Sequence, residues 1–200
     1  KSLRNVLLSI KDAFGIREII DRTQFPYKVL EPQYSKEIAQ SKNSDAQNFA
    51  KQLDDWAAGK LPPRTTLVLG VTPDILVKLG VKQLPLEISQ KVVEKVVYPQ
   101  GIGDGKHDLG LDLLKKLPEQ LDDLIRVFKS ATQPNSIVVL TELSDKQGRR
   151  VIAAIKLDAV HNHNIVNAVA SMYGRTNEIS FIKKEISEGR LLYHNKEKSR

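Results

Sequence analysis

The sequence contains no cysteine, and several other familiar signatures are missing as well. Without cysteine there can be no disulfide bond, no thiolate nucleophile and no cysteine-ligated zinc or iron–sulfur site. The absence of cysteine does not indicate in which cellular compartment the protein is found. No apolar run approaches the roughly 18 residues that a membrane-spanning helix needs, and no secretory leader is evident. The dinucleotide-binding, P-loop and GxSxG patterns are also absent. These absences argue against a membrane protein, a familiar nucleotide-binding site and a serine hydrolase.

Basic residues are in excess, and the excess lies toward the C-terminus. The 200 residues carry a formal net charge of +7, and 40% hydrophobic with 28% charged residues is ordinary for a globular protein with one sizeable core. From Ser144 to Arg200 there are eleven Lys or Arg residues against six Asp or Glu residues. Such a basic segment suits a polyanion such as RNA, although a solvated surface that binds no nucleic acid has the same composition.

The first 60 residues predict a helical extension or linker. Apolar residues keep three-and-four spacing over 1–22 and again over 45–58, which predicts two helices. The segment 23–43 between them contains prolines and no period, and we expect a loop there. The chain begins without methionine, so we expect a fragment of a longer polypeptide, with residues 1–60 as an extension and 61–200 as the main domain.

Residues 61–200 carry helical patterns first and then a run of strand patterns, which predicts an α+β fold. We expect a twisted antiparallel sheet with helices packed on one face and the other face free for a ligand. The predicted strands cover 65–70, 84–88, 125–130, 136–143, 151–158, 164–173 and 191–195. The predicted helices cover 73–79 after a Thr72 cap, 90–97, 111–121 with a kink at Pro118, and 178–188.

The stretch NIVNAVASMYGRTN (164–177) holds the first functional hint. Strict alternation assigns Val166, Ala168, Ala170 and Met172 to one face of a strand, and Ile165, Asn167, Val169, Ser171 and Tyr173 to the other. We expect Gly174 to supply a positive φ angle in the turn that follows, with Thr176 or Asn177 capping the next helix. Turn chemistry does not explain why Arg175 follows a hydroxyl and a phenol on the same face.

The glycine-rich segment GIGDGKHDLG (101–110) supplies a histidine, His107, in a loop. An exposed loop histidine is often inert, but imidazole is also the commonest proton carrier near neutral pH. His161 and His163 share one side of a strand, yet no third ligand stands at suitable spacing, so we predict no metal site. Cleavage of RNA without metal needs a base, an acid and groups that stabilise phosphorane charge, and His, Ser, Tyr, Arg and Lys can fill these roles.

From about Leu67 to Lys198 the chain resembles the C-terminal domain of phage MuF-type head-morphogenesis proteins, a family grouped with the barnase, EndoU, colicin and RelE-like toxin nucleases. The segments that support this resemblance are LGVTPDILVKLGVKQLPLEIS, KHDLGLDLLKKLP, VVLTELSDKQGRRVIAAIKLD, VNAVASMYGRTN and FIKKEISEGRLLYHNKEKSR. The resemblance implies a small α+β toxin domain that cleaves RNA, with tRNA as one candidate substrate, without metal or cofactor. It also implies a cognate immunity protein, a carrier polypeptide or phage head protein, and a virion-associated or secreted effector acting in the bacterial cytoplasm.

The resemblance also implies a set of site residues. His107, Ser171, Tyr173 and Arg175 are the catalytic candidates, with His107 as general acid or base and Tyr173 as its partner or as a transition-state donor. Ser171 would orient the phosphate, and Arg175 would balance developing negative charge. The substrate-binding candidates are Lys106, Lys156, Asn167, Asn177, Tyr193 and Lys196.

Two alternatives stay open at this point. An NAD-targeting or ADP-ribosylating toxin would stack adenine on Tyr173 or Tyr193 and use a catalytic glutamate, for which only Glu142 and Glu178 stand nearby in the sequence. A non-enzymatic virion cargo or docking module would use the polar strand face to bind protein.

Overall fold

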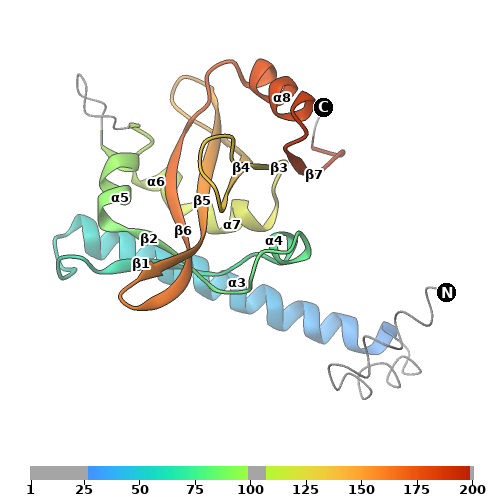
Figure 1. Cartoon of the computed structure of the whole chain (residues 1–200). Helices are drawn as coiled ribbons and strands as arrows, with labels where there is room; N and C mark the ends of the chain where they lie inside the picture. The colour runs from blue at the N-terminus through green and yellow to red at the C-terminus, as the bar shows by residue number, and fades with distance from the viewer. Residues whose placement is uncertain (1–26, 99–106, 199–200) are drawn as a thin grey trace. The chain divides into compact units, whose positions relative to one another are not determined.

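The strands of the domain form one seven-stranded sheet, and its helices pack mainly on one side (Figure 1). The computed structural model describes residues 27–98 and 107–198, with side chains from residue 41 onward. The chain divides into two compact units, residues 1–41 and 42–200. The helix predicted over 1–22 lies outside the described residues. The predicted α+β class is confirmed within the second unit.

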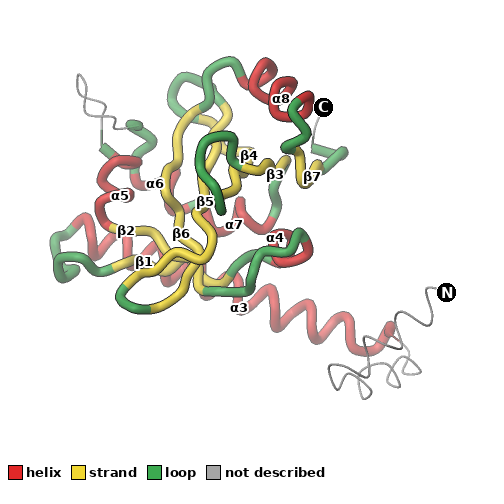
Figure 2. The backbone as a smooth tube through the Cα atoms, viewed as in Figure 1, coloured by secondary structure: helices red, strands yellow, loops and turns green. Residues whose placement is uncertain are grey.

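The sheet is mixed rather than purely antiparallel, because one pair of neighbouring strands is parallel. The strand order is β1-β2-β6-β5-β4-β3-β7, and only β2 and β6 run in the same direction. The longest strands are the neighbours β5 and β6, which Figure 2 shows side by side. The bounds are β1 Thr66–Val71, β2 Pro85–Ser89, β3 Arg126–Lys129, β4 Ser136–Ser144, β5 Arg150–His161, β6 Asn164–Gly174 and β7 Leu191–His194.

The helices give the sheet a core face and an open face. The core face carries Val139, Ala153 and Val169, which join one large buried cluster with side chains from the helices on that side. The open face carries Val138, Ile152 and Tyr173, and helix α8 covers part of it through Ile182. The bounds are α3 Tyr27–Ala57, α4 Asp74–Lys78, α5 Gln90–Val97, α6 Leu111–Lys115, α7 Leu117–Asp122 and α8 Glu178–Ser187.

Two local predictions were wrong. The loop expected over 23–43 is helical from Tyr27 onward, because the segment after Pro32 is rich in helix-forming Lys, Glu, Ala and Gln even though it lacks an apolar period. Thr72 does not cap α4. Its hydroxyl is buried and instead donates to the Leu84 carbonyl at 2.8 Å and accepts the Leu84 N–H at 3.1 Å. The predicted break near Pro118 is confirmed, since α6 ends before it and α7 begins beside it.

The face assignment for β6 was also wrong beyond Val169, because the strand contains a β-bulge. Ile155 of β5 pairs with Val169, whereas the preceding Ala154 pairs with Ser171, so Ala170 is an extra residue on β6. The extra residue shifts the alternation by one position. Val169 and Met172 therefore both join the main core, while Ser171 and Tyr173 turn to the open face.

Candidate functional site

His107 reaches β6 along the part of the strand that β2 leaves unpaired. β2 pairs only with Asn167–Val169, after which the chain enters α5 behind a cap in which the Ser89 hydroxyl accepts the Val92 N–H. The end of α5 then holds His107, because the His107 backbone N–H donates to the Lys95 carbonyl at 2.8 Å. His107 is thus fixed beside the second half of β6, where the bulge has turned Ser171 outward.

The predicted catalytic residues His107, Ser171 and Tyr173 form a single cluster. The Nε2 atom of His107 lies 3.3 Å from the Ser171 hydroxyl oxygen. The rings of His107 and Tyr173 are 5.3 Å apart between centroids and tilted by 38°. An imidazole, a hydroxyl and a phenol from segments 64 or more residues apart therefore share one corner of the open face.

The electrostatic surroundings favour the neutral form of His107. Partial burial lowers the pKa of the imidazole, and the nearby charge of Lys95 lowers it further. A histidine with a lowered pKa is unprotonated at neutral pH, so one ring nitrogen can accept a proton. Next to the loop, Asp108 forms an ion pair with Lys146 at 2.8 Å, which ties this segment to the β4–β5 turn. The cluster can therefore supply a general base with hydroxyl donors beside it.

Arg175 lies apart from that cluster, against helix α8. Its guanidinium carbon is 4.5 Å from the centre of the Phe181 ring, and its backbone N–H donates to the Arg150 carbonyl at 2.8 Å. Its Nε atom is buried without a hydrogen-bond partner among the described residues. The structure also gives Asn177 a left-handed conformation at the start of α8, with no side-chain capping bond. Arg175 and Asn177 line a cavity together with Arg149 and Arg150. The sequence patterns did not indicate these two arginines as site residues.

Asn167 is used within the fold rather than held open for a ligand. Asn167 is buried, with only 1% of its surface exposed. Its amide donates to the Thr72 hydroxyl at 2.8 Å and to the Lys82 carbonyl at 3.0 Å, and its oxygen accepts the Asp158 N–H at 3.2 Å. These partners account for the amide without a substrate.

The remaining substrate-binding candidates are scattered over the sheet. Lys156 is exposed on the open face, two residues from Ala154, the partner of Ser171. Tyr193 pairs with Val127 and packs against the main core, and Lys196 is exposed just beyond β7. Lys106 lies outside the described residues.

Gly174 is required by a close approach and not by a positive φ angle, contrary to the prediction. A Cβ atom at this position would lie 1.9 Å from Oδ2 of the buried Asp145. That carboxylate holds the β4–β5 turn, since it accepts the Arg149 N–H at 2.8 Å and the Arg149 Nε at 2.6 Å. The β4–β5 turn therefore packs closely against the end of β6.

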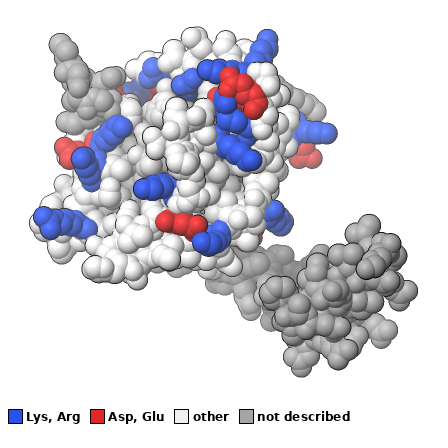
Figure 3. Space-filling view, viewed as in Figure 1, with Lys and Arg blue, Asp and Glu red and all other residues white. Residues whose placement is uncertain are grey.

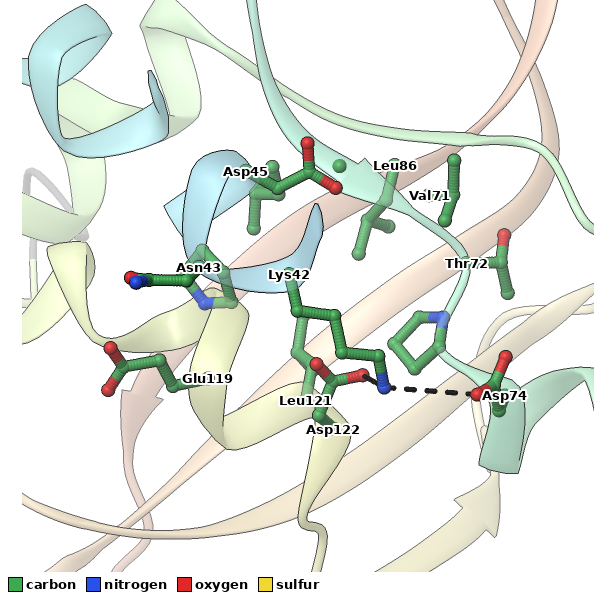
Figure 4. A pocket seen from close by; sticks show the side chains of 14 residues that line it. Lys42, Asn43, Asp45, Val71, Thr72, Asp74, Leu86, Glu119, Leu121 and Asp122 are labelled. Atoms are coloured by element: carbon green, nitrogen blue, oxygen red, sulfur yellow. Dashed lines mark hydrogen bonds and ion pairs between the residues drawn. The ribbon is translucent and has the colours of Figure 1, made fainter. Parts of the chain in front are cut away.

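A second cavity, of about 320 Å³, lies between α3, β1 and α7 and is shown in Figure 4. Lys42, which also lines the cavity, partly neutralises the carboxylates of Asp122 and Asp74, because its ammonium group lies 2.9 Å from the first and 3.8 Å from the second. Glycine is needed at position 70, where φ is +132° and a Cβ atom would meet Asp45 at 2.8 Å. This cavity contains none of the predicted site residues.

The other histidines and acidic residues do not form a metal centre in the described part of the chain. His161 is engaged by Glu87, with Nδ1 and Oε2 3.0 Å apart. Among the side chains described, those of residues 41–98 and 107–198, no three of His, Asp or Glu gather closely enough to hold a metal ion. Glu142, a candidate for NAD chemistry, is paired with Lys198 at 2.8 Å.

Comparison with known proteins supplies a family. Residues 100–200 match the model of the phage MuF C-terminal domain. The chain belongs to this family. The matched segment includes the His107 loop, β3 to β7 and α8, and so holds the whole His107, Ser171 and Tyr173 cluster. The phage MuF part of the predicted resemblance is thereby confirmed over 100–200.

The comparisons with curated proteins and with solved structures give no match. A phage context is consistent with association with the virion and with a phage head protein as carrier. Within residues 27–98 and 107–198, none of the helices combines the length and apolar character that crossing a bilayer would need.

Proposed function

We propose that this MuF C-terminal domain is a metal-independent ribonuclease of the toxin type. The observation that carries the proposal is the 3.3 Å approach of His107 Nε2 to the Ser171 hydroxyl, with the Tyr173 ring beside the imidazole. The lowered pKa of His107 supports it, because a base that works at neutral pH must be unprotonated there. The formal net charge of +7 suits an RNA substrate.

In the proposed reaction neutral His107 accepts the proton of the RNA 2′-hydroxyl. The 2′-oxygen then forms a bond to the adjacent phosphorus, the bond to the 5′-oxygen breaks, and a 2′,3′-cyclic phosphate results. The Tyr173 hydroxyl gives its proton to the departing 5′-oxygen and recovers one from the imidazolium in turn. Ser171 donates a hydrogen bond to a non-bridging phosphate oxygen, which stabilises the charge of the phosphorane.

We infer the biological setting from the phage family together with the proposed activity. A ribonuclease domain attached to a phage head protein, or to a secreted carrier, would act in the cytoplasm of a bacterium. Such an activity needs a cognate immunity protein in the producing cell. RNA is the proposed substrate, with tRNA as one candidate.

The test compares two histidine variants of the full chain. Purified wild-type protein with EDTA should cleave bacterial RNA and leave cyclic phosphate ends. His107→Asn should lower the rate by at least about 100-fold, the usual scale for loss of a positioned base. The matched control is His163→Asn, since His163 is exposed in the β5–β6 turn and asparagine tolerates its φ of 69°. Cleavage that requires a divalent cation, or that survives in His107→Asn, would refute the proposal.

A virion docking module is the second candidate, and one surface feature favours it. Val160 and Ile165 face each other across the tip of the β5–β6 hairpin and are 69% and 56% exposed. Paired exposed apolar residues are common at protein contacts. Expression in bacteria separates the candidates, because a docking module should leave growth unchanged, whereas a ribonuclease should arrest it in a His107-dependent way.

A further inference from the structure

A cavity of about 560 Å³ lies beyond the end of β6, on the side of the sheet that α8 covers. Three segments line it: the β4–β5 turn with the first residue of β5, the connection between β6 and α8, and the first turn of α8. Basic side chains prevail on the molecular face shown in Figure 3, and three arginines belong to this cavity. The lining residues are Gly148, Arg149, Arg150, Arg175, Asn177, Glu178, Ile179 and Ser180.

Two of these arginines oppose each other across the strands. Ile152 pairs with Tyr173 and Val151 with Gly174, and the bond from the Arg175 N–H to the Arg150 carbonyl continues this register. Arg150 and Arg175 therefore form the next cross-strand pair, on the same face as Tyr173. Like charges placed directly opposite each other destabilise a sheet.

Within the described residues, Arg150 and Arg175 differ from Arg149 in lacking a carboxylate partner, although Glu178 also lines the cavity. Arg149 is bound to the buried carboxylate of Asp145. Arg150, by contrast, donates to the backbone carbonyl of Glu142, and Arg175 rests on the Phe181 ring with its Nε buried and unbonded. Neither forms an ion pair with a carboxylate among the side chains that the structure describes, in residues 41–98 and 107–198. The cavity thus presents two guanidinium groups that form no ion pair with a described side chain, and guanidinium is the chemistry that recognises phosphate.

We propose that this cavity binds a backbone phosphate of the RNA strand, next to the phosphate held at His107. Arg175 follows Tyr173 by two residues, and the bond from its backbone N–H to the Arg150 carbonyl continues the strand register, which places the two positions about 7 Å apart along one face. One single strand can therefore occupy both in succession, with its bases free to stack on the aromatic side chains of that face. The inference rests on the proposed function, and it assigns Arg150 together with Arg175 to substrate positioning.

The experiment measures binding of a fluorescent 2′-O-methyl oligoribonucleotide to the full chain at several salt concentrations. This probe lacks the 2′-hydroxyl and cannot be cleaved by the proposed reaction, so binding is read apart from catalysis. Arg150→Gln and Arg175→Gln should each weaken binding by about 3- to 10-fold and reduce the salt slope by about 0.7, the value for one phosphate contact to a single strand. Because Arg175 also packs on Phe181, Arg150→Gln is the variant that leaves that contact intact.

The control is Lys51→Gln, which removes one positive charge from α3, a helix of the opposite face, where the Lys51 side chain is 81% exposed. Wild-type affinity and slope in both arginine variants would overturn the inference, even if RNA were cleaved with His107 dependence. Arginine-dependent binding without any cleavage would instead refute the ribonuclease and leave the phosphate cavity standing. Equal losses in Lys51→Gln and in the arginine variants would show a diffuse charge effect and would also overturn it.

Discussion

At the scale of single residues, the central observation is that His107, Ser171 and Tyr173 meet although 64 residues separate the first two. The residue types were recognisable from the sequence, because imidazole, hydroxyl and phenol suit proton transfer at a phosphate. Their contact was not, since it depends on a bulge at Ala170 and on a loop anchored to Lys95. Arg175 was grouped with them in the sequence, but the structure places it with Arg149 and Arg150.

The surroundings of His107 predict how cleavage should depend on pH. If neutral His107 is the base, the rate should rise as the imidazole loses its proton. The inflection should lie below 6.5, the pKa of an unperturbed histidine, because burial and then the charge of Lys95 lower the pKa. Lys95→Gln removes the second cause, so the inflection should move upward while remaining below 6.5. The measurement is the initial rate of RNA cleavage across the acid to neutral range.

A charge on the same helix provides the control. Lys91→Gln removes an exposed positive charge one turn earlier on α5, and the charge of Lys91 is not among the causes of the shift. It should leave the inflection where the wild type has it. A downward movement in Lys95→Gln, or equal movements in both variants, would contradict the assignment of His107 as the base.

At the scale of elements, α8 decides which part of the sheet is open. The Phe181 ring meets Phe128 edge to face, with centroids 5.5 Å apart, and carries Arg175 on its face. Ile182 adds contacts to the cluster of Ile125, Leu140 and Ile152. One end of the open face is therefore closed by apolar packing, while the corner at His107 stays accessible.

Removing the Phe181 ring should weaken this closure. Phe181→Ala should lower the free energy of unfolding by about 1–3 kcal/mol, below the value for a fully buried phenylalanine because Phe181 is only half-buried. Denaturant unfolding followed by circular dichroism measures the change. Ile179→Ala on the same helix should be nearly neutral, since Ile179 is 70% exposed. Equal effects of the two substitutions would show that α8 is not held by the Phe181 contacts.

At the scale of the whole molecule, the question is where the folded domain begins. The sequence predicted a boundary near residue 60, and that boundary stays a prediction. The compact unit extends from Lys42, and Phe49 and Leu53 of α3 are 0% exposed in its main core. Helix α3 is therefore one of the elements that bury the core face.

Two truncations test the boundary. Residues 42–200 should fold with a cooperative melting transition, because they retain the whole buried cluster. Residues 61–200 should melt at clearly lower temperature or lose the transition, since loss of each large buried side chain costs about 2–5 kcal/mol. Calorimetry of the two proteins decides the matter, and equal melting temperatures would place the boundary near residue 60 after all.

Local pattern by itself determined the fold class, the positions of most helices and strands from Thr66 onward, and the residue types at the candidate site. It could do so because periodicity, capping and turn residues act over a few neighbouring positions. Tertiary structure alone decided the parallel β2–β6 pairing, the shift of face at Ala170, the approach of His107 to Ser171 and the opposition of Arg150 to Arg175. Each of these depends on register between segments distant in the chain, and a single added residue in one strand reverses every side chain that follows.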